Sequence, residues 1–380
     1  MPVANEINSP FDQLVGQPLA AAYLSAAVQA RYLAQAYLFI GPLGAGKAQA
    51  ASLFARSLLC PNQGDDDCEA CRLVTSQSHP DLKTLAPEGA GAYLAAQMHD
   101  LIREATLAPI LSSRKVYIVS QSDRMSTHFA NAFLRLLEEP PRNVVFILLA
   151  QSLTAILPTI QSRCQLVPFA AVPESIGISL LVDECAIDID AARAALAYSA
   201  GSVADARDLV LSTNLNALKR ELTDCLRGLV SYDALDVLEA ARSLVIACKL
   251  PLDELRADQE RRLEEGRELL SRSALNNLEQ RLKREMTAAE RGSVVWVIHA
   301  IRIWLRDVLL YVTARADEIV NTDQRDLVAL YASSLKTPLG SVLRCLDATL
   351  EADLNLDYNV SVQSIFEFLL FTIRAELGEQ

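Results

Sequence analysis

A glycine-rich segment at residues 41–49, GPLGAGKAQ, carries residue types that can bind a phosphate group. The pattern G-x-x-x-x-G-K-[ST] is met by Gly41, Gly46 and Lys47. In such a loop the backbone N–H groups and the start of the following helix surround the phosphates, and the lysine reaches the terminal ones. The last position of the pattern supplies a hydroxyl to Mg²⁺. This chain has Ala48 there, whose methyl group cannot bind the ion.

A second group that hydrolysis requires is also missing. Beside a loop of this kind, a neighbouring strand normally ends in an acidic pair, with one carboxylate for the metal and one for the attacking water. The candidate segment KVYIVSQSDRM, residues 115–125, offers Ser120 and Gln121 after Val119, and neither side chain is a carboxylate. The residues therefore predict no hydrolysis. They leave open whether the loop binds ATP or ADP or is only a tight turn between a strand and a helix.

Three closely spaced cysteines form a second candidate site. Cys60, Cys68 and Cys71 lie in CPNQGDDDCEAC, shortly after the glycine loop. Structural zinc is held by four ligands, mostly thiolate or imidazole. The spacing therefore predicts a structural zinc site, with free thiols in a surface loop as the alternative. The other five cysteines are scattered, and we expect most of them to be small buried hydrophobic residues.

The composition indicates a packed globular protein of two or three domains, with 380 residues, 51% of them hydrophobic and 22% charged. A net charge of −12 argues against a stand-alone nucleic-acid binder, although not against a role in a larger DNA-binding assembly. The sequence shows no secretory signal and no apolar run of the roughly 20 residues that a membrane helix needs. We therefore expect a cytoplasmic protein without a membrane segment, whose eight cysteines are free or metal-bound.

The order of apolar runs predicts an α/β domain that positions the glycine loop. Short apolar runs at 36–40, 116–119 and 144–149 read as buried strands, and the first of them leads directly into the loop. Helical patterns follow the loop and occur again at 98–109 and 128–141. This alternation predicts a largely parallel sheet with flanking helices.

Beyond Phe169 we expect only helices. Residues 171–211 read as three short helices, and longer ones follow. Within Val294–Val312, one stripe is formed by Val297, Ile301, Trp304 and Val308, which predicts an amphipathic helix.

Several segments occur in the order found in one family. They are LVGQ at 14–17, YLFIGPLGAGK at 37–47, LLC…CEAC…HPDL at 58–82, NAFLRLLEEPP at 131–141 and ILPTIQSRCQ at 156–165. In these segments the chain resembles the clamp-loader ATPase subunits of bacterial DNA polymerase III, which belong to the AAA+ class. The resemblance is dense from about residue 10 to 170 and weaker to about 210. Beyond that it rests on helical character and a faint likeness at YNVSVQSIFEFLLF.

The resemblance implies three domains. These are an α/β AAA+ core at 1–170 with a zinc-module insertion near 60–71, an all-helical lid at 171–212, and an all-helical collar domain at 213–380. It further implies a pentameric ring with gamma/tau and delta clamp-loader subunits. That ring opens the sliding clamp and loads it on primed DNA.

The resemblance also implies roles for individual residues. The motor subunit of the family carries an arginine in its lid where this chain has Ala204, so Ala48, Ser120, Gln121 and Ala204 all depart from the motor's pattern. The motif Ser162-Arg163-Cys164 is intact. This combination resembles a subunit that hydrolyses no ATP itself and supplies an arginine finger, here Arg163, to a neighbouring motor.

On that reading Gly41, Gly44, Gly46 and Lys47 form a vestigial phosphate loop. The alternatives are a gamma-like motor and an AAA+ protein of DNA repair or recombination.

The family often carries four cysteines in the pattern C-x8-C-x2-C-x2-C, which bind zinc. Cys68 and Cys71 match the last two of them, and the second position falls at Asp65. The resemblance therefore implies zinc on Cys60, Cys68, Cys71 and Asp65, with Asp66 or Asp67 as competing ligands.

Overall fold

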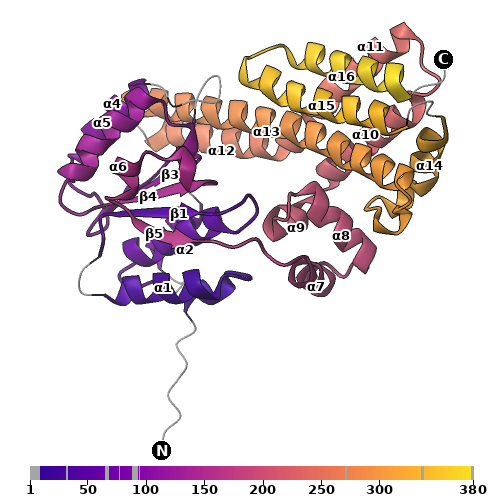
Figure 1. Ribbon diagram of the computed structural model, residues 1–380. Coiled ribbons are helices and arrows are strands. Elements are labelled where there is room, and N and C mark those ends of the chain that lie inside the picture. The colour runs from indigo at the N-terminus through magenta and orange to yellow at the C-terminus, as the bar shows by residue number, and fades with distance from the viewer. Residues whose placement is uncertain are drawn as a thin grey trace, which may run out of the picture. The chain divides into compact units, whose positions relative to one another are not determined.

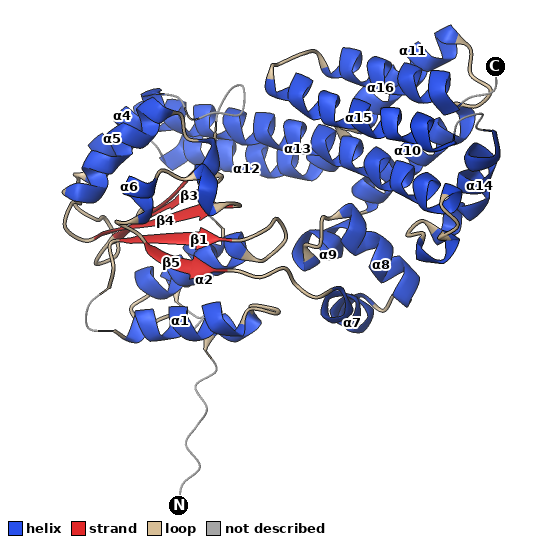
Figure 2. Ribbon diagram, in the orientation of Figure 1, coloured by secondary structure: helices blue, strands red, loops and turns tan. Residues whose placement is uncertain are grey.

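The computed structural model describes residues 9–30, 33–64, 68–76, 78–87, 93, 95–269, 272–334 and 338–377. The chain divides into two compact units. The first unit consists of Met1–Ser179 and Ala200–Ala204, and the second of Leu180–Ser199 and Asp205–Gln380. All strands of the described residues belong to the first unit, whereas the second is helical (Figures 1 and 2).

A five-stranded parallel sheet forms the centre of the first unit. Its strands are β1 (Ala36–Ile40), β2 (Leu82–Leu85), β3 (Lys115–Val119), β4 (Val144–Ala150) and β5 (Gln165–Pro168). They lie in the order β2-β3-β4-β1-β5, and every pairing is parallel. The three expected strands, β1, β3 and β4, are confirmed. The edge strands β2 and β5 are not anticipated by the sequence pattern, because they mix buried with exposed positions.

Helices cover both faces of this sheet (Figure 1). Alternate residues of β1 point to opposite faces, as strand geometry requires. Tyr37 and Phe39 join a core cluster with α1 and α2, and Leu38 joins a second cluster with α4 and α5. The helical segments of the first unit are η1 (Pro10–Gln13), α1 (Pro18–Gln29), α2 (Lys47–Leu59), α3 (Glu69–Thr75), α4 (Ala95–Ala105), η2 (Ser122–Arg124), α5 (Thr127–Glu138), η3 (Leu153–Ala155) and α6 (Pro158–Gln161).

The described part of the chain beyond β5 contains helices and no strand, as expected. Three short helices occupy 174–211, which confirms the pattern predicted there. The helices and 3₁₀ turns are α7 (Glu174–Cys185), α8 (Ile189–Tyr198), α9 (Val203–Leu211), α10 (Thr213–Gly228), α11 (Ala234–Ala247), η4 (Leu250–Leu252), α12 (Asp253–Leu269), α13 (Arg272–Val312), η5 (Ala316–Glu318), η6 (Thr322–Gln324), α14 (Arg325–Ser334), α15 (Pro338–Asp357) and α16 (Val362–Leu377).

Helix α13 is the central packing element of the second unit. The expected stripe of Val297, Ile301, Trp304 and Val308 is buried along it. Two side chains of α13 also contact α8. Trp296 stacks on Tyr198, and His299 Nε2 lies 3.0 Å from the carbonyl oxygen of Ala197. The contacts make α8 part of the second unit. The domain boundaries expected at residues 170 and 212 stay a prediction.

No helix in the described ranges is both long enough and apolar enough to cross a membrane.

A buried carboxylate fixes the turn that precedes β3. Asp81 is 2% exposed and accepts hydrogen bonds from the backbone N–H groups of Ile110 (2.7 Å), Leu111 (2.7 Å) and Ser112 (2.8 Å). Burial alone would raise the pKa of Asp81, but these three donors and the neighbouring His79 outweigh it and hold that pKa below its usual value. The motif HPDL, one of the family segments, thus has a structural role here.

We expect Asp81→Asn to destabilise the protein by about 1–3 kcal/mol at pH 7, because an amide accepts more weakly than a carboxylate and brings donors that face other donors. The carboxylate pKa is depressed in the folded state. Its contribution is therefore present above the unfolded value of about 3.9 and is lost as pH falls through the folded value. Urea unfolding of both proteins between pH 3 and 7 measures this. Asp100→Asn, on the exposed face of α4, serves as the control. A difference in unfolding free energy between the two proteins that does not depend on pH would contradict this role of the Asp81 carboxylate.

Candidate functional site

The glycine loop joins β1 to α2 at the carboxyl edge of the sheet. Gly41 follows β1, and Gly46 is the residue before α2, with a left-handed φ of 79°. Gly44 also has a positive φ of 73°, and a Cβ there would lie 2.6 Å from the backbone nitrogen of Ser202. Only glycine fits at that position. No side chain caps the first turn of α2, so its N–H groups face the loop as in phosphate-binding loops.

The lysine of the loop is bound by the loop itself. Lys47 Nζ donates to the carbonyl oxygens of Gly41 (2.6 Å) and Pro42 (2.5 Å). Burial lowers the pKa of Lys47, and the carboxylate of Asp123 partly opposes this effect. A phosphate would therefore replace internal hydrogen bonds of the lysine rather than bind a free ammonium group.

The residues that depart from the hydrolytic pattern lie at the edge of the sheet that carries the loop. Ala48 is exposed on the first turn of α2. Ser120 and Gln121 follow β3, at the same edge of the parallel sheet as the loop. The carbonyl oxygen of Ser120 accepts a hydrogen bond from Tyr93, and the backbone of Gln121 is left-handed with a φ of 49°. Their side chains offer no carboxylate to this edge.

Asp123 is a residue of this site that the sequence pattern did not single out. It lies two residues beyond Gln121, within the 3₁₀ turn η2. Its Oδ1 is buried and has no hydrogen-bond partner among the described atoms, and its charge acts on both Lys47 and Tyr93. A search for a carboxylate up to four residues after the strand, rather than two, would have found it.

Arg163 lies between α6 and the edge strand β5. Its Nη2 forms an ion pair with Oε1 of Glu138 at 2.8 Å, and its Nη1 donates to the carbonyl oxygen of Thr159 at 3.0 Å. Glu138 belongs to the LLEEPP segment, so two of the family motifs meet in this pair. Both side chains are partly exposed, 36% for Arg163 and 49% for Glu138. The next residue, Cys164, packs against the core, and burial raises its thiol pKa to about 12.

The register of the sheet separates Arg163 from the phosphate loop of its own chain. β5 pairs with β1 in parallel, with Gln165 opposite Tyr37 and Pro168 opposite Ile40, and Arg163 lies two residues before β5, in the turn that follows α6. The phosphate loop begins after the end of β1. At about 3.3 Å per residue, the start of β5 and the loop are roughly 13 Å apart along the strands, and Arg163 precedes that start.

The three cysteines expected to bind metal come together. The sulfur atoms of Cys60, Cys68 and Cys71 lie within 4.8 Å of one another, and the Cys60–Cys68 separation is 3.4 Å. Zinc–thiolate bonds of about 2.3 Å in a tetrahedron put sulfurs roughly 3.8 Å apart, so the cluster fits zinc. Backbone N–H groups of Asn62 and Cys71 donate to two of the sulfurs.

The electronic setting of the cluster also suits a metal. Burial would raise the pKa of Cys68, but hydrogen bonds from its neighbours outweigh this and lower that pKa below the ordinary thiol value. The predicted fourth ligand, Asp65, with Asp66 and Asp67, lies outside the described residues. Nearby His79 is not free to replace it: its Nδ1 accepts from the backbone of Asp81, and its Nε2 lies 3.2 Å from the Ser112 hydroxyl.

Among the scattered cysteines, Cys225, Cys248 and Cys345 are buried, which confirms the expectation for most of the five. Burial raises their pKa values to about 12.

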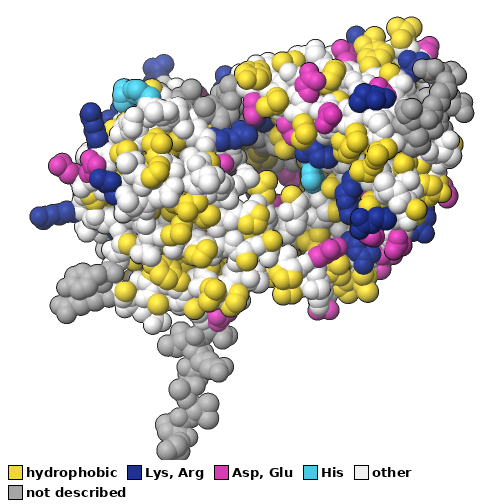
Figure 3. Space-filling model, in the orientation of Figure 1, with side chains coloured by type: hydrophobic (Ala, Val, Ile, Leu, Met, Phe, Trp, Pro, Cys, Tyr) yellow, Lys and Arg dark blue, Asp and Glu magenta, His cyan; other side chains and the backbone are white. Residues whose placement is uncertain are grey.

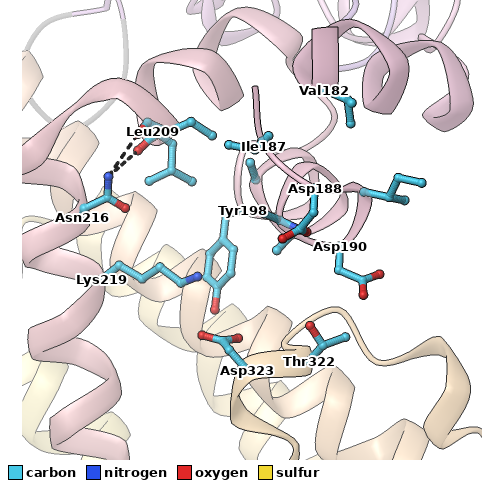
Figure 4. A pocket seen from close by; sticks show the side chains of 15 residues that line it. Val182, Ile187, Asp188, Asp190, Tyr198, Leu209, Asn216, Lys219, Thr322 and Asp323 are labelled. Atoms are coloured by element: carbon cyan, nitrogen blue, oxygen red, sulfur yellow. Dashed lines mark hydrogen bonds between the residues drawn. The ribbon is translucent and has the colours of Figure 1, made fainter. Parts of the chain in front are cut away.

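A cavity of about 870 Å³ in the second unit lies outside the predicted sites (Figure 4). Its polar end holds Lys219, whose Nζ is 4.9 Å from the ring centre of Tyr198, and the carboxylate of Asp323. Its carboxylates are exposed, and its charges are mixed. We assign no ligand to this cavity.

Comparison with known proteins finds relatives of the first unit. Residues 16–173 match the family model described as DNA polymerase III, delta subunit. The delta-prime subunit of DNA polymerase III from Bacillus subtilis is 37% identical over 156 residues, which cover 40% of this chain and 47% of that protein. The gamma/tau subunit from Mycobacterium bovis is 32% identical over 179 residues, covering 46% of this chain and 31% of that protein.

Among solved structures, a gamma-subunit-related protein of DNA polymerase III from Thermotoga maritima aligns with 94% of this chain and 99% of its own, at 18% identity and a TM-score of 0.46. The chain spans about half or less of the length of the curated relatives that it matches. Residues 16–173 of the chain are thus similar to the delta and delta-prime subunits of DNA polymerase III.

Proposed function

We propose that this chain is a clamp-loader subunit of the delta-prime type. It hydrolyses no ATP itself and supplies Arg163 as an arginine finger to a neighbouring gamma/tau subunit. In this role it joins gamma/tau and delta in a pentameric ring that loads the sliding clamp on primed DNA. We propose that the chain acts in the cytoplasm.

The position of Arg163 relative to the loop of its own chain carries the proposal. The roughly 13 Å along the strands between the start of β5 and the loop already exceeds the reach of an arginine side chain. Arg163 therefore cannot act on a nucleotide in its own loop, but a group at this edge is available to a neighbour. A guanidinium suits the task, because it is planar, always charged and forks onto phosphate oxygens.

The ion pair with Glu138 is compatible with an arginine finger whose phosphate is supplied only by the neighbouring subunit. Exposed pairs of this kind contribute only about 0–1 kcal/mol, so a phosphate can displace the carboxylate at small cost. Until then Glu138 holds the guanidinium in one place, together with the carbonyl oxygen of Thr159.

The lack of metal-binding and water-binding side chains at the loop and after β3 supports the non-hydrolysing role. Ala48, Ser120 and Gln121 leave Mg²⁺ and the attacking water without the groups that usually hold them. The loop remains a folded scaffold, which can bind ATP or ADP without turnover. This chain has Ala204 at the position where the motor subunit carries its lid arginine.

A gamma-like motor is the second candidate function, and Asp123 is the observation that favours it. Its buried, unpartnered oxygen is a carboxylate ligand close enough to influence Lys47. The identity to gamma/tau subunits points the same way.

Zinc is the proposed cofactor of the cysteine cluster. Cys60, Cys68 and Cys71 would hold the ion, with Asp65 as the proposed fourth ligand. The ion would join α3 to the end of α2 and serve folding rather than chemistry.

The first prediction concerns turnover. We expect the purified full chain to show no magnesium-dependent ATP hydrolysis above that of Lys47→Ala, because the metal and the water have no side-chain ligands. A coupled phosphate-release assay measures this. Hydrolysis that disappears in both Lys47→Ala and Asp123→Asn would overturn the proposal in favour of the motor.

The second prediction concerns Arg163. In a complex reconstituted with gamma/tau and delta subunits, Arg163→Ala should leave assembly intact and slow the neighbouring active site by roughly 10³-fold. The total ATPase rate of the complex then falls by the fraction that this one active site contributes. Arg163→Lys should not restore it, since a point charge lacks the fork.

The matched control is Arg103→Ala, an exposed arginine of α4 that is also paired with an acidic side chain. It should retain the wild-type rate. An Arg163→Ala complex that hydrolyses ATP at the unmodified rate would show that Arg163 is not a finger.

The third prediction concerns metal. Elemental analysis of protein purified without chelator should find about one zinc per chain. Cys68→Ser with Cys71→Ser should abolish binding and lower the melting temperature, and Asp65→Ala should lower the affinity. Cys185→Ser, a half-buried cysteine of α7, should keep the zinc. The absence of zinc from the wild-type protein would refute the site.

A further inference from the structure

Side chains that can react as nucleophiles gather at one place in the described part of the chain. The sulfur atoms of Cys60, Cys68 and Cys71 lie within 4.8 Å of one another, and the described residues contain no second group of three histidine, cysteine or acidic side chains that comes as close. On the face that Figure 3 shows, the histidine side chains lie apart and the acidic side chains are mixed with basic ones. The cysteine cluster is therefore the place to expect side-chain chemistry other than metal binding.

Cys60 and Cys68 are placed to join in a disulfide. Their sulfur atoms are 3.4 Å apart, within hydrogen-bonding distance of each other. Cys60 is the residue after α2 and Cys68 the residue before α3, and both have an extended backbone, with φ and ψ of −80° and 131° for Cys60 and −85° and 162° for Cys68. Because neither residue is held inside a helix, the two side chains need only a small movement to reach the roughly 2 Å of a disulfide bond.

The third cysteine, Cys71, is held differently. It is buried within the first turn of α3, and its backbone N–H donates to the sulfur of Cys68 at 3.4 Å. A disulfide between Cys68 and Cys71 would have to close within this turn, whereas Cys60 approaches Cys68 from the end of another helix. The geometry therefore favours Cys60 as the partner of Cys68.

Solvent reaches the cluster at Cys68. This residue is half-buried, whereas Cys60 and Cys71 are buried. A small reagent from solution therefore meets the sulfur of Cys68 first and finds that of Cys60 next to it. A solvent-accessible cysteine beside a second cysteine is the arrangement typical of cysteines that react reversibly with peroxide.

We propose that Cys68 is an oxidation site for hydrogen peroxide and that Cys60 resolves the product as a disulfide. The thiolate of Cys68 attacks one oxygen of the peroxide, the O–O bond breaks and hydroxide leaves, so that Cys68 becomes a sulfenic acid. The thiolate of Cys60 then attacks the sulfur of Cys68 and displaces a second hydroxide. Together the two sulfurs lose two electrons, and these reduce one peroxide to two hydroxide ions.

The disulfide would leave the cluster with too few ligands for a metal. Structural zinc is held by four ligands, and of the three thiolates only that of Cys71 would remain. This chain has Asp65 where the family that it resembles often has a further cysteine, so one disulfide removes most of its sulfur ligands. Oxidation therefore releases the ion, and the new bond joins the ends of α2 and α3 in its place. This consequence rests on the proposed zinc site.

The test exposes the full chain to limiting hydrogen peroxide after the reductant used in purification has been removed. Peptide mapping by mass spectrometry identifies the disulfide, thiol titration of the denatured protein counts free cysteines, and a chromogenic chelator measures released zinc. Cys60→Ser removes the resolving thiol. Cys185→Ser, which replaces a half-buried cysteine of α7, is the matched control. The melting temperature of each variant checks its folding.

We expect the thiol count of the wild-type chain to fall from eight to six, because two of its eight cysteines pair. The mapped peptides should join Cys60 to Cys68, and zinc should be released as the disulfide forms. The control should form the same disulfide. In Cys60→Ser that disulfide is absent, and a 1,3-diketone reagent should trap the sulfenic acid at Cys68.

Three results for the wild-type chain would overturn the inference, whether or not the variants fold. They are a disulfide between Cys68 and Cys71, an oxidised Cys68 without a disulfide, and retention of all eight thiols. Zinc that stays bound after the disulfide has formed would refute the proposed release. A wild-type chain that contains no zinc but forms the Cys60–Cys68 disulfide would uphold the oxidation site and refute the proposed zinc site.

Discussion

The parallel pairing of β5 with β1 is the constraint on which the functional account depends. It puts the end of β1, and therefore the phosphate loop, at one edge of the sheet, and Arg163, two residues before β5, at the other. Neither position can change without shifting the register, and a shift of one residue would turn the buried Val167 of β5 to the opposite face. The sheet thus separates Arg163, the proposed arginine finger, from the phosphate loop of its own chain. The proposed role of Arg163 therefore requires a nucleotide in another chain.

The loop has the glycines and the lysine of the pattern, and each of them has a structural role. Gly44 accepts a backbone approach that any side chain would block, and Gly46 begins α2 with a left-handed conformation. Lys47 satisfies its ammonium group on the carbonyl oxygens of Gly41 and Pro42. These features stabilise the connection between β1 and α2 whether or not nucleotide binds. The fold of the loop therefore does not depend on residues that bind metal or water.

The sequence pattern predicted the strands that are buried on both faces of the sheet. It missed the two edge strands, which are partly exposed. Strands β1, β3 and β4 are continuously apolar, whereas LKTL of β2 and QLVP of β5 alternate too little to stand out. Only Val294–Val312 of the long α13 carried a helical stripe, because the described side chains in the first half of that helix are mostly polar and, apart from Leu282, not buried.

Within the sites, the grouping of Cys60, Cys68 and Cys71 followed from spacing alone. The ion pair between Arg163 and Glu138 joins residues 25 positions apart, and it depends on how α5 packs beside α6. No local pattern encodes that packing. Asp123 was within reach of the sequence but lay beyond the two positions where a carboxylate was expected.

The most direct test of the central claim is ATP turnover by a complex in which only this chain retains its phosphate-loop lysine. The lysine of every gamma/tau loop is replaced by alanine, and this chain and delta are left unchanged. The account predicts no turnover above background, because Lys47 lies in a loop without metal or water ligands. Magnesium-dependent turnover that persists in this complex, and that Lys47→Ala then removes, would contradict it.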